Sequence, residues 1–279
     1  MFYAINKKRG ESSFFAIKKF AKNNNIKKIG HSGTLDPLAE GLLIVATDED
    51  TKTLSYLTND TKEYFVKATL HCQSRSYDEG EEIKYLQNKN KITLEELKYA
   101  LEKIKKQTKQ TPPIFSAKKI NGKRSYELAR NNIEIELKQC DIKIYDLVLD
   151  SFDFEKQEFT LKTKVSKGTY IRSLIHDIGI LLKTDAVVNI LKRTAIGNIK
   201  LDNNYEYKQI VDIKTLFNVE LYLLDDLEIK NIKSKIVYLK RLKNINNNGL
   251  FIYNNQIIGW GKIKDGLITF EKVLFNRIF

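Results

Sequence analysis

Groups that could do acid–base or nucleophilic chemistry gather in one glycine-rich segment near the N-terminus. The segment reads Gly30-His31-Ser32-Gly33-Thr34-Leu35-Asp36-Pro37-Leu38-Ala39-Glu40-Gly41. Its glycines permit backbone angles that other residues avoid, and Pro37 disfavours helical angles at Asp36. The apolar run at residues 42–46 is typical of a buried strand. We therefore expect a stiff loop beside a core strand, which would hold the Asp36 carboxylate still.

The residue types alone leave several interpretations of this loop open. Asp36 could be a reactive carboxylate, or it could cap its own backbone in an Asx turn. A hydrolase triad of His31, Ser32 and Asp36 is a third alternative. Three triad members so close together in one loop rarely reach the required geometry, and the sequence contains no nucleophile-elbow motif.

The overall composition indicates a globular protein with a polyanionic partner. The 279 residues, of which 42% are hydrophobic, suffice for one large domain and a small one. The net charge of +13 favours nucleic acid as the partner, with a membrane surface second. A lysine-rich proteome would give the same excess, so charge alone is a weak signal. No apolar run approaches the length of a membrane span.

The cysteines and histidines show no metal-site or redox pattern. Cys72 and Cys140 are not part of a Cys-x-x-Cys pair, and His31, His71 and His176 lack metal-ligand spacing. The N-terminus has no apolar signal core. We expect a soluble cytoplasmic protein with reduced cysteines and no metal site.

The glycine-rich segment resembles the catalytic motif of the TruB-type tRNA pseudouridine synthases, whose aspartate is the essential catalytic residue. The resemblance implies that Asp36 has this role. Because the target base must be flipped out of its stack, His31 is a candidate for occupying the position that the base vacates or for holding the displaced nucleotide. The match is long and chemically unusual, which argues against chance.

Two further segments resemble motifs of this family. Tyr64 matches the tyrosine that stacks on the target base, although a half-buried strand tyrosine would look the same. Arg172 matches an arginine that pairs with the catalytic aspartate and would keep Asp36 ionised, and Tyr170 matches a tyrosine near the base. The segments are Lys62-Glu63-Tyr64-Phe65-Val66 and Ser166-Lys167-Gly168-Thr169-Tyr170-Ile171-Arg172-Ser173-Leu174.

The resemblance also covers a pocket leucine and an RNA clamp. Leu191 matches a leucine that lines the base pocket, but packing a core requires the same side chain. Residues 113–130 look like the family's substrate-clamping loop. Lys118, Lys123 and Arg124 occur there with aromatic residues, and such a mixture can grip phosphates and bases. A solvated hairpin is the alternative. The family's Lys-Pro-x-Gly is replaced here by Lys7-Lys8-Arg9-Gly10, which lacks the proline.

The elements that must position these residues indicate an α+β fold with a mixed, largely antiparallel sheet. We expect a catalytic domain at residues 1–227, with a clamping insertion at about 113–135, and a small basic β-rich module at 228–279. Residues 230–279 contain ten Lys or Arg and two acidic residues. The expected helices are one capped by Ser12 or Ser13 that carries Phe14, Ile17, Phe20 and Ala21, one at 51–58, one opened by a capping box at Thr93, and one at 169–183. The expected strands are 2–5, 63–72, 133–154, 158–165, 251–258 and 267–274, with a hairpin turn at 121–122 and a loop at 244–249.

The resemblance implies a standalone enzyme that isomerises uridine 55 in the T loop of tRNA. It implies the tRNA T arm as partner, no redox cofactor, metal or ATP, and a monomer without an obligate protein partner. A non-catalytic RNA-binding protein would explain the charge but would leave Asp36 and Arg172 without a role. A guide-dependent RNA pseudouridine synthase is a narrower alternative. His31, where that branch is expected to have an arginine, favours the standalone type.

Overall fold

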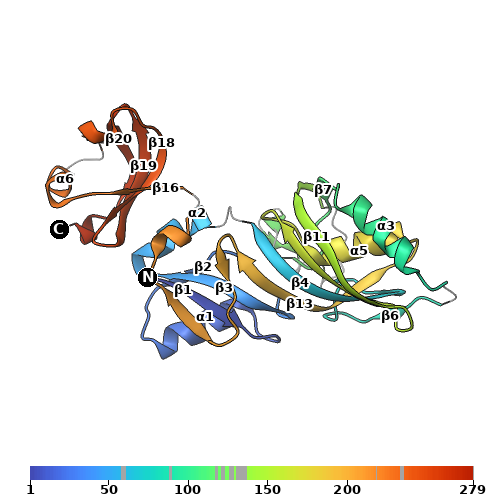
Figure 1. Ribbon diagram of the computed structural model, residues 1–279. Coiled ribbons are helices and arrows are strands. Elements are labelled where there is room, and N and C mark those ends of the chain that lie inside the picture. Colours follow the sequence, from blue (N-terminus) through green and yellow to red (C-terminus); the bar gives the residue numbers. More distant parts are fainter. Residues whose placement is uncertain are drawn as a thin grey trace.

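One mixed β-sheet, with strands from residues 2 to 210, forms the core of the larger part of the fold. The computed structural model describes residues 1–57, 61–87, 90–116, 119–120, 123–125, 129, 137–217, 219–232 and 236–278. Among these residues the main sheet has the order β11-β12-β4-β13-β3-β1-β15, with β14 paired to β13 and β2 to β3 (Figure 1). Its strands are β1 (Phe2–Lys7), β2 (Ile29–His31), β3 (Ala39–Thr47), β4 (Lys62–Leu70), β11 (Ile144–Asp153), β12 (Glu158–Val165), β13 (Ala186–Ile196), β14 (Ile199–Lys200) and β15 (Tyr207–Ile210).

The strands of this sheet are antiparallel except where β13 meets β3. There the pairing is parallel, with Leu191 opposite Ala39 and Arg193 opposite Gly41. β13 also pairs along its length with β4, where Arg193 lies opposite Tyr64. The central strand β13 therefore lies between β3, which begins at the end of the glycine-rich loop, and β4, which carries Tyr64. It contributes Leu191 itself.

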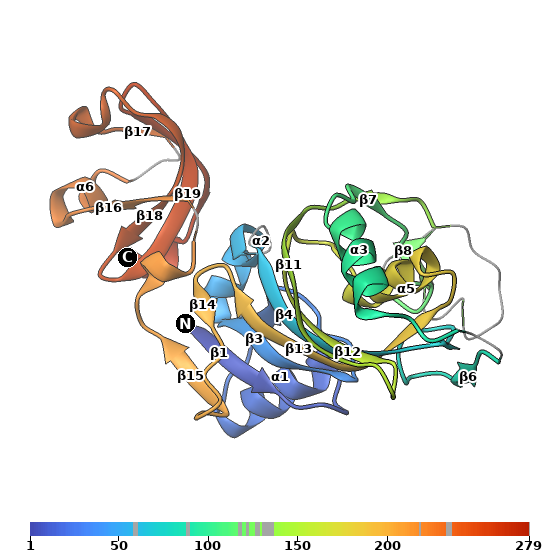
Figure 2. The ribbon, with the colours of Figure 1, turned by 45° about the vertical axis from the view of Figure 1, so that its right-hand side comes forward.

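The helices cover this sheet with apolar faces that the sequence predicts. Helix α1 packs Ile17 and Phe20 against Ile5, Leu43 and Val45 of β1 and β3. Helices α3 and α5 pack together against the half of the sheet that contains β4, β12 and β13 (Figure 2). The helices are α1 (Ser13–Asn23), α2 (Leu54–Leu57), α3 (Leu94–Ile104), α5 (Ile171–Leu181) and α6 (Asp226–Lys230). Short 3₁₀ turns occur at Asp48–Thr53, Ile213–Thr215, Lys240–Leu242 and Phe275–Arg277.

Several predicted elements are confirmed. The side chains of Tyr64, Val66, Ala68 and Leu70 are all buried, as the alternation in β4 predicts. Thr93 forms the predicted capping box with Glu96. The predicted hairpin pairs β8 with β9, although its turn residues 121–122 lie outside the described residues. The short strands are β5 (Cys72–Gln73), β6 (Lys84–Tyr85), β7 (Lys109–Gln110), β8 (Lys119–Ile120), β9 (Lys123–Arg124) and β10 (Cys140–Asp141).

A second, smaller sheet closes the chain, in the order β16-β18-β19-β20-β17 among the described residues. It lies apart from the α3 and α5 end of the main sheet (Figures 1 and 2). Its strands are β16 (Glu220–Leu223), β17 (Ile236–Tyr238), β18 (Asn246–Tyr253), β19 (Gln256–Lys264) and β20 (Leu267–Val273). Because β16 already belongs to this sheet, we propose that the small module begins before Glu220 rather than at residue 228.

The small module also corrects two strand predictions. The expected loop at 244–249 is wrong, because β18 begins at Asn246 and pairs with β19. The expected single strand 251–258 is also wrong, because Asn254 and Asn255 turn the chain between β18 and β19. Both have positive φ, 47° and 57°, which asparagine tolerates better than most residues. Apolar residues on both sides of this turn hid it in the sequence pattern.

Two other expectations need adjustment. The expected helix 51–58 is a 3₁₀ turn (Asp48–Thr53) followed by the short α2, and residue 58 lies outside the described residues. The expected strand 133–154 is divided into β10 and β11, and its first four residues lie outside the described part. In the part of the chain that the structure describes, no helix is long and apolar enough to cross a membrane.

Candidate active site

The loop that carries Asp36 is tied to the first turn of α1. The hydroxyl of Ser13 accepts a hydrogen bond from the Leu35 N–H and donates one to the Leu35 carbonyl, both at 2.8 Å. Ser13 is buried, so both bonds are shielded from water. The residue before Asp36 is therefore fixed to a helix that is itself packed on β1 and β3.

A buried lysine holds the other side of the loop. Lys7 Nζ donates to the carbonyls of Ala39 at 2.6 Å, Lys8 at 2.9 Å and Pro37 at 3.3 Å. Burial lowers the pKa of Lys7 to about 8. The Gly10 N–H also donates to the Pro37 carbonyl at 2.8 Å. The turn at 7–10 thus contacts the loop that carries Asp36, although it lacks the proline of the family motif that it resembles.

Arg193 lies beneath the same loop and was not predicted as a site residue. Its side chain is buried; Nε donates to the Leu42 carbonyl at 2.7 Å and one terminal nitrogen donates to the Gly33 carbonyl at 3.0 Å. Burial lowers its pKa, and the neighbouring Tyr64 hydroxyl opposes that shift. A charged residue inside a strand as apolar as β13 was the signal that could have identified it.

Arg172 joins Asp36 to the opposite wall. Its Nε donates to Asp36 Oδ2 at 2.9 Å, and its terminal nitrogens donate to the carbonyls of Ser76 at 2.7 Å and Phe115 at 2.8 Å. The Arg172 side chain is 4% exposed, whereas that of Asp36 is 36% exposed. The guanidinium is therefore a fixed, buried group that orients a carboxylate still open to a ligand.

Asp78 is a second carboxylate at this guanidinium, and the sequence analysis did not identify it as a site residue. Its Oδ2 lies 3.5 Å from Arg172 Nε. Its Oδ1 accepts from the Ser76 hydroxyl at 2.6 Å and from the Gly80 N–H at 2.9 Å. One arginine thus faces two carboxylates that come from different loops.

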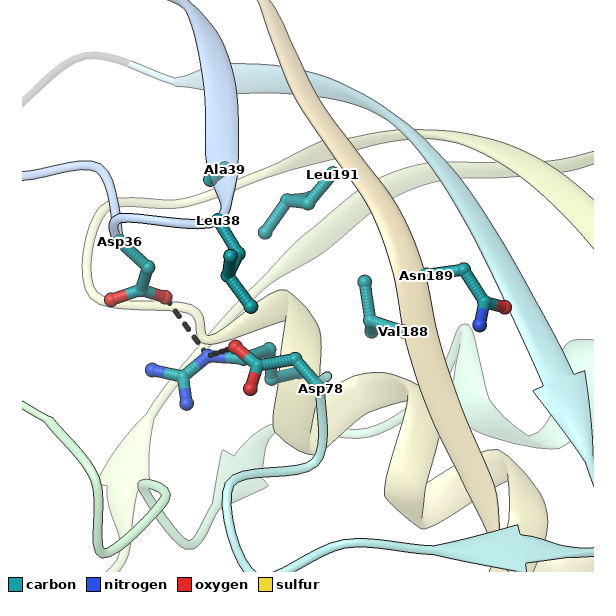
Figure 3. Close-up of a pocket in the computed structure, with 8 residues that line it drawn as sticks. Asp36, Leu38, Ala39, Asp78, Val188, Asn189 and Leu191 are labelled. Carbon is teal, nitrogen blue, oxygen red and sulfur yellow. Dashed lines mark hydrogen bonds and ion pairs between the residues drawn. The ribbon is translucent and has the colours of Figure 1, made fainter. Parts of the chain in front are cut away.

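These groups line one small pocket. Figure 3 shows Asp36 and Asp78 on one side, with the apolar side chains of Leu38, Val188 and Leu191 beside them. The full lining is Asp36, Leu38, Ala39, Asp78, Arg172, Val188, Asn189 and Leu191. The structure thus brings three of the predicted site residues, Asp36, Arg172 and Leu191, to the same pocket. Its mixture of apolar walls and ionised groups suits a flat, uncharged ring held beside a carboxylate.

The other predicted site residues lie around this pocket rather than in its lining. Tyr64 is buried in β4 opposite Arg193. Tyr170 precedes α5, where its backbone N–H and carbonyl both bond to the Gln110 amide, and burial raises its pKa. His31 ends β2; burial and the nearby Arg193 lower its pKa, and its Nδ1 has no hydrogen-bond partner among the described residues.

The predicted clamp lies largely outside the described residues. Lys118 is not described, and of Lys123 and Arg124 only the backbone of β9 is described. The described end of this segment does reach the site, because the Phe115 carbonyl accepts from Arg172. The roles of Lys118, Lys123 and Arg124 remain predictions.

Comparison with known proteins shows the family to which the sequence is similar. Residues 19–171 match the model of the TruB family pseudouridylate synthase N-terminal domain. The chain is 41% identical over 278 residues to "tRNA pseudouridine synthase B" of Mycoplasma mobile, covering 100% of this chain and 96% of that protein. It is 42% identical over 199 residues to the protein of that name from Fusobacterium nucleatum, covering 71% and 68% of the two chains.

Solved structures share the fold at lower sequence identity. One chain of a crystal structure of a Cbf5-Nop10-Gar1 complex aligns with a TM-score of 0.70 and 18% identity, over 98% of this chain and 84% of that one. A chain in a structure of an H/ACA RNP bound to a substrate RNA aligns with a TM-score of 0.69. At this identity the alignments show the shared fold.

Proposed function

The chain belongs to the TruB family of pseudouridylate synthases, and we propose that it converts uridine 55 in the T loop of tRNA to pseudouridine. The reaction breaks the N1–C1′ glycosidic bond, turns the uracil and joins C5 to C1′. The C5 proton leaves and N1 takes up a proton, so the product has the mass of the substrate. The observation that carries this proposal is the Arg172–Asp36 ion pair in the lining of a partly apolar pocket.

The chemistry of the pocket supports Asp36 as the reacting group. Three first steps are open to a carboxylate here: attack on C1′, attack on C6, or removal of the 2′ proton. Each requires an ionised carboxylate with one face free. Arg172 occupies Oδ2 of Asp36, and the 36% exposure of this side chain leaves room for the nucleotide.

The target base is stacked inside the T loop, so it must leave that stack to reach Asp36. In our proposal Leu191 packs against the extruded uracil, and Tyr64 and Tyr170 complete its surroundings. His31 then occupies the position that the base has left, or holds the displaced nucleotide. Lys118, Lys123 and Arg124 hold the tRNA backbone. We also propose that the enzyme acts as a monomer in the cytoplasm.

The decisive experiment is incubation of the protein with an unmodified tRNA transcript, followed by mapping of pseudouridine. We expect modification of uridine 55 alone and no change in RNA mass. Asp36→Asn should bind tRNA within a few-fold of wild type and form no detectable product. Asp202→Asn, which changes an exposed aspartate, is the matched control and should remain fully active.

Other outcomes separate the alternatives. Release of a fragment would indicate a hydrolase, and tight binding without product would indicate a non-catalytic RNA-binding protein. Activity that appears only after a second RNA is added would indicate a guide-dependent enzyme. Turnover by Asp36→Asn at more than a few per cent of the normal rate would exclude Asp36 as the reacting group.

A further inference from the structure

The turn that presents Asp78 to Arg172 has an unusual backbone. Tyr77, the residue before Asp78, has a φ of 60°. Bulky side chains rarely adopt this left-handed conformation, and it persists only where surrounding contacts hold it. The turn is nevertheless important to the site, because the Ser76 carbonyl and the Asp78 carboxylate both face Arg172.

Two backbone bonds and one ring contact hold Tyr77 in this conformation. Its N–H donates to the Ser74 carbonyl at 3.1 Å, and its carbonyl accepts from the Val188 N–H at 3.0 Å. Its ring stacks on His176, with centroids 4.1 Å apart and planes 10° from parallel. Unlike the two backbone hydrogen bonds, this ring contact depends on which side chains are present at positions 77 and 176.

His176 is itself held in place. Its Nδ1 lies 2.7 Å from Asp185 Oδ1, and that carboxylate also accepts from the Ala186 N–H at 2.7 Å. Asp185 directly precedes β13, which forms the pocket wall. The imidazole plane is therefore fixed against the sheet and offers Tyr77 a rigid surface.

His176 and Arg172 both belong to α5 and are four residues apart. This spacing places them one above the other on the same face of the helix. The helix thus contacts the 76–78 turn twice, through Arg172 at Ser76 and Asp78 and through His176 at Tyr77. A shift of the turn would change the partners of Arg172, which also orients Asp36.

We propose that the Tyr77–His176 stack is a positioning device for the catalytic pair. It holds the strained 76–78 turn against Arg172, so that Arg172 keeps Asp36 in the reactive orientation. Tyr77 and His176 are positioning residues that act through Arg172. The catalytic part of this inference rests on the proposed function, whereas the contact itself does not.

Four variants test the stack. His176→Ala removes the imidazole, and His176→Phe keeps a flat ring in its place. Tyr77→Gly removes the ring and allows the positive φ, whereas Tyr77→Phe keeps the ring. His71→Ala is the matched control. Like His176, His71 makes side-chain hydrogen bonds, in this case to Thr184 and Gln157, but neither of these residues belongs to the 76–78 turn.

The first measurement is the single-turnover rate at saturating tRNA, together with the dissociation constant and the unfolding midpoint of each variant. A displacement of about 1 Å at a reacting group can cost up to about a hundredfold in rate. We expect His176→Ala and Tyr77→Gly to lose about ten- to a hundredfold in rate, with tRNA affinity within threefold of wild type. His176→Phe and Tyr77→Phe should stay within about threefold in rate, as should His71→Ala.

The second measurement needs no activity. The Nε–H resonance of Arg172 in a ¹H–¹⁵N spectrum of the free protein reports its bond to Asp36. We expect it to shift in His176→Ala and Tyr77→Gly, and to stay in place in the two Phe variants and His71→Ala. If the wild type made no pseudouridine, the proposed function would fail and this spectrum would still test the stack.

Two results would overturn the inference. The first is that His176→Ala and Tyr77→Gly both fold, react at wild-type rates and leave the Arg172 Nε–H resonance where it is in the wild type. The other is a lower unfolding midpoint with an unchanged rate, which would make the stack purely structural.

Discussion

The Nε of Arg172 lies 2.9 Å from Oδ2 of Asp36, although one residue belongs to a helix and the other to a loop on the far side of the pocket. The arginine is buried and the carboxylate is not. Each terminal nitrogen of Arg172 also donates a hydrogen bond, one to the Ser76 carbonyl and the other to the Phe115 carbonyl. The guanidinium therefore cannot turn to follow a ligand, and Asp36 is oriented before tRNA arrives.

This arrangement predicts different effects of two Arg172 substitutions. Arg172→Lys keeps the charge but cannot reach Asp36, Ser76 and Phe115 together, so it should keep a small part of the activity. Arg172→Met should lose nearly all of it, about a thousandfold or more in single-turnover rate. In both variants tRNA affinity should change less than the rate. A Met variant that lost binding but kept its rate at saturating tRNA would make Arg172 a phosphate contact.

The clamp predicts a change in salt dependence. Lysine and arginine contacts to phosphates release counterions, so tRNA affinity should fall steeply as salt rises. Replacing Lys123 and Arg124 with alanine should flatten the log–log slope by roughly one to two units. The same loss of charge at the exposed Lys98 and Lys103 of α3 is the control and should leave the slope unchanged. Equal slopes for the clamp variant and wild type would place the RNA elsewhere.

The lowered pKa of the buried Lys7 predicts that the stability of the fold depends on pH. Its pKa falls from 10.5 to about 8 on folding because of burial, so between these values the unfolded chain binds more protons. The free energy of unfolding should therefore rise with pH from about 8 to about 10.5, by at most about 1.4 kcal/mol per pH unit. Urea unfolding of wild type and Lys7→Met at several pH values measures this. The variant should lack that rise, and parallel curves would show that Lys7 does not titrate in this range.

We expect the addition of a single methyl group at Gly41 to destabilise the fold. Its φ is +103°, and a Cβ there would lie 2.4 Å from the Arg193 carbonyl oxygen on the neighbouring strand. Gly41→Ala should cost about 2–4 kcal/mol in the free energy of unfolding, from the backbone conformation and the overlap together. Gly168→Ala is the control, because its φ is +82° but no atom lies within 4 Å of its Cβ position. It should cost only about 1 kcal/mol, and equal losses would show that the overlap is relieved.

Parts of the fold and of the site were predictable where a single short stretch of sequence contains both a residue and the neighbours that determine its conformation. The glycine-rich loop, the buried face of β4 and the capping box at Thr93 are local patterns of this kind. The pairing of Arg172 with Asp36 came from resemblance to a family, because no local rule connects residues so far apart. Asp78 had no such support and looks ordinary within its own segment, whereas the charge of Arg193 inside the apolar strand β13 was a local signal that the prediction did not use.

The same reasoning explains the errors in the small module. Asn254 and Asn255 form a tight turn, but the residues on both sides are mostly apolar and resemble one continuous strand. The stretch from Asn246 to Asn248 is polar, which is typical of a loop, yet it pairs with Lys262 to Lys264 on the next strand. Only the partner strand makes these residues part of a sheet.

The parallel junction between β3 and β13 has a consequence for synthesis of the chain. Asp36 precedes Arg172 by 136 residues, and β13 follows later still. At about 5–20 residues per second, a ribosome needs on the order of ten seconds to make the intervening chain. During that time the loop of Asp36 has neither its arginine nor the strand beneath it. If Asp36 is the reacting group as proposed, we expect the nascent chain to stay inactive toward the RNA around it until nearly 200 residues have emerged.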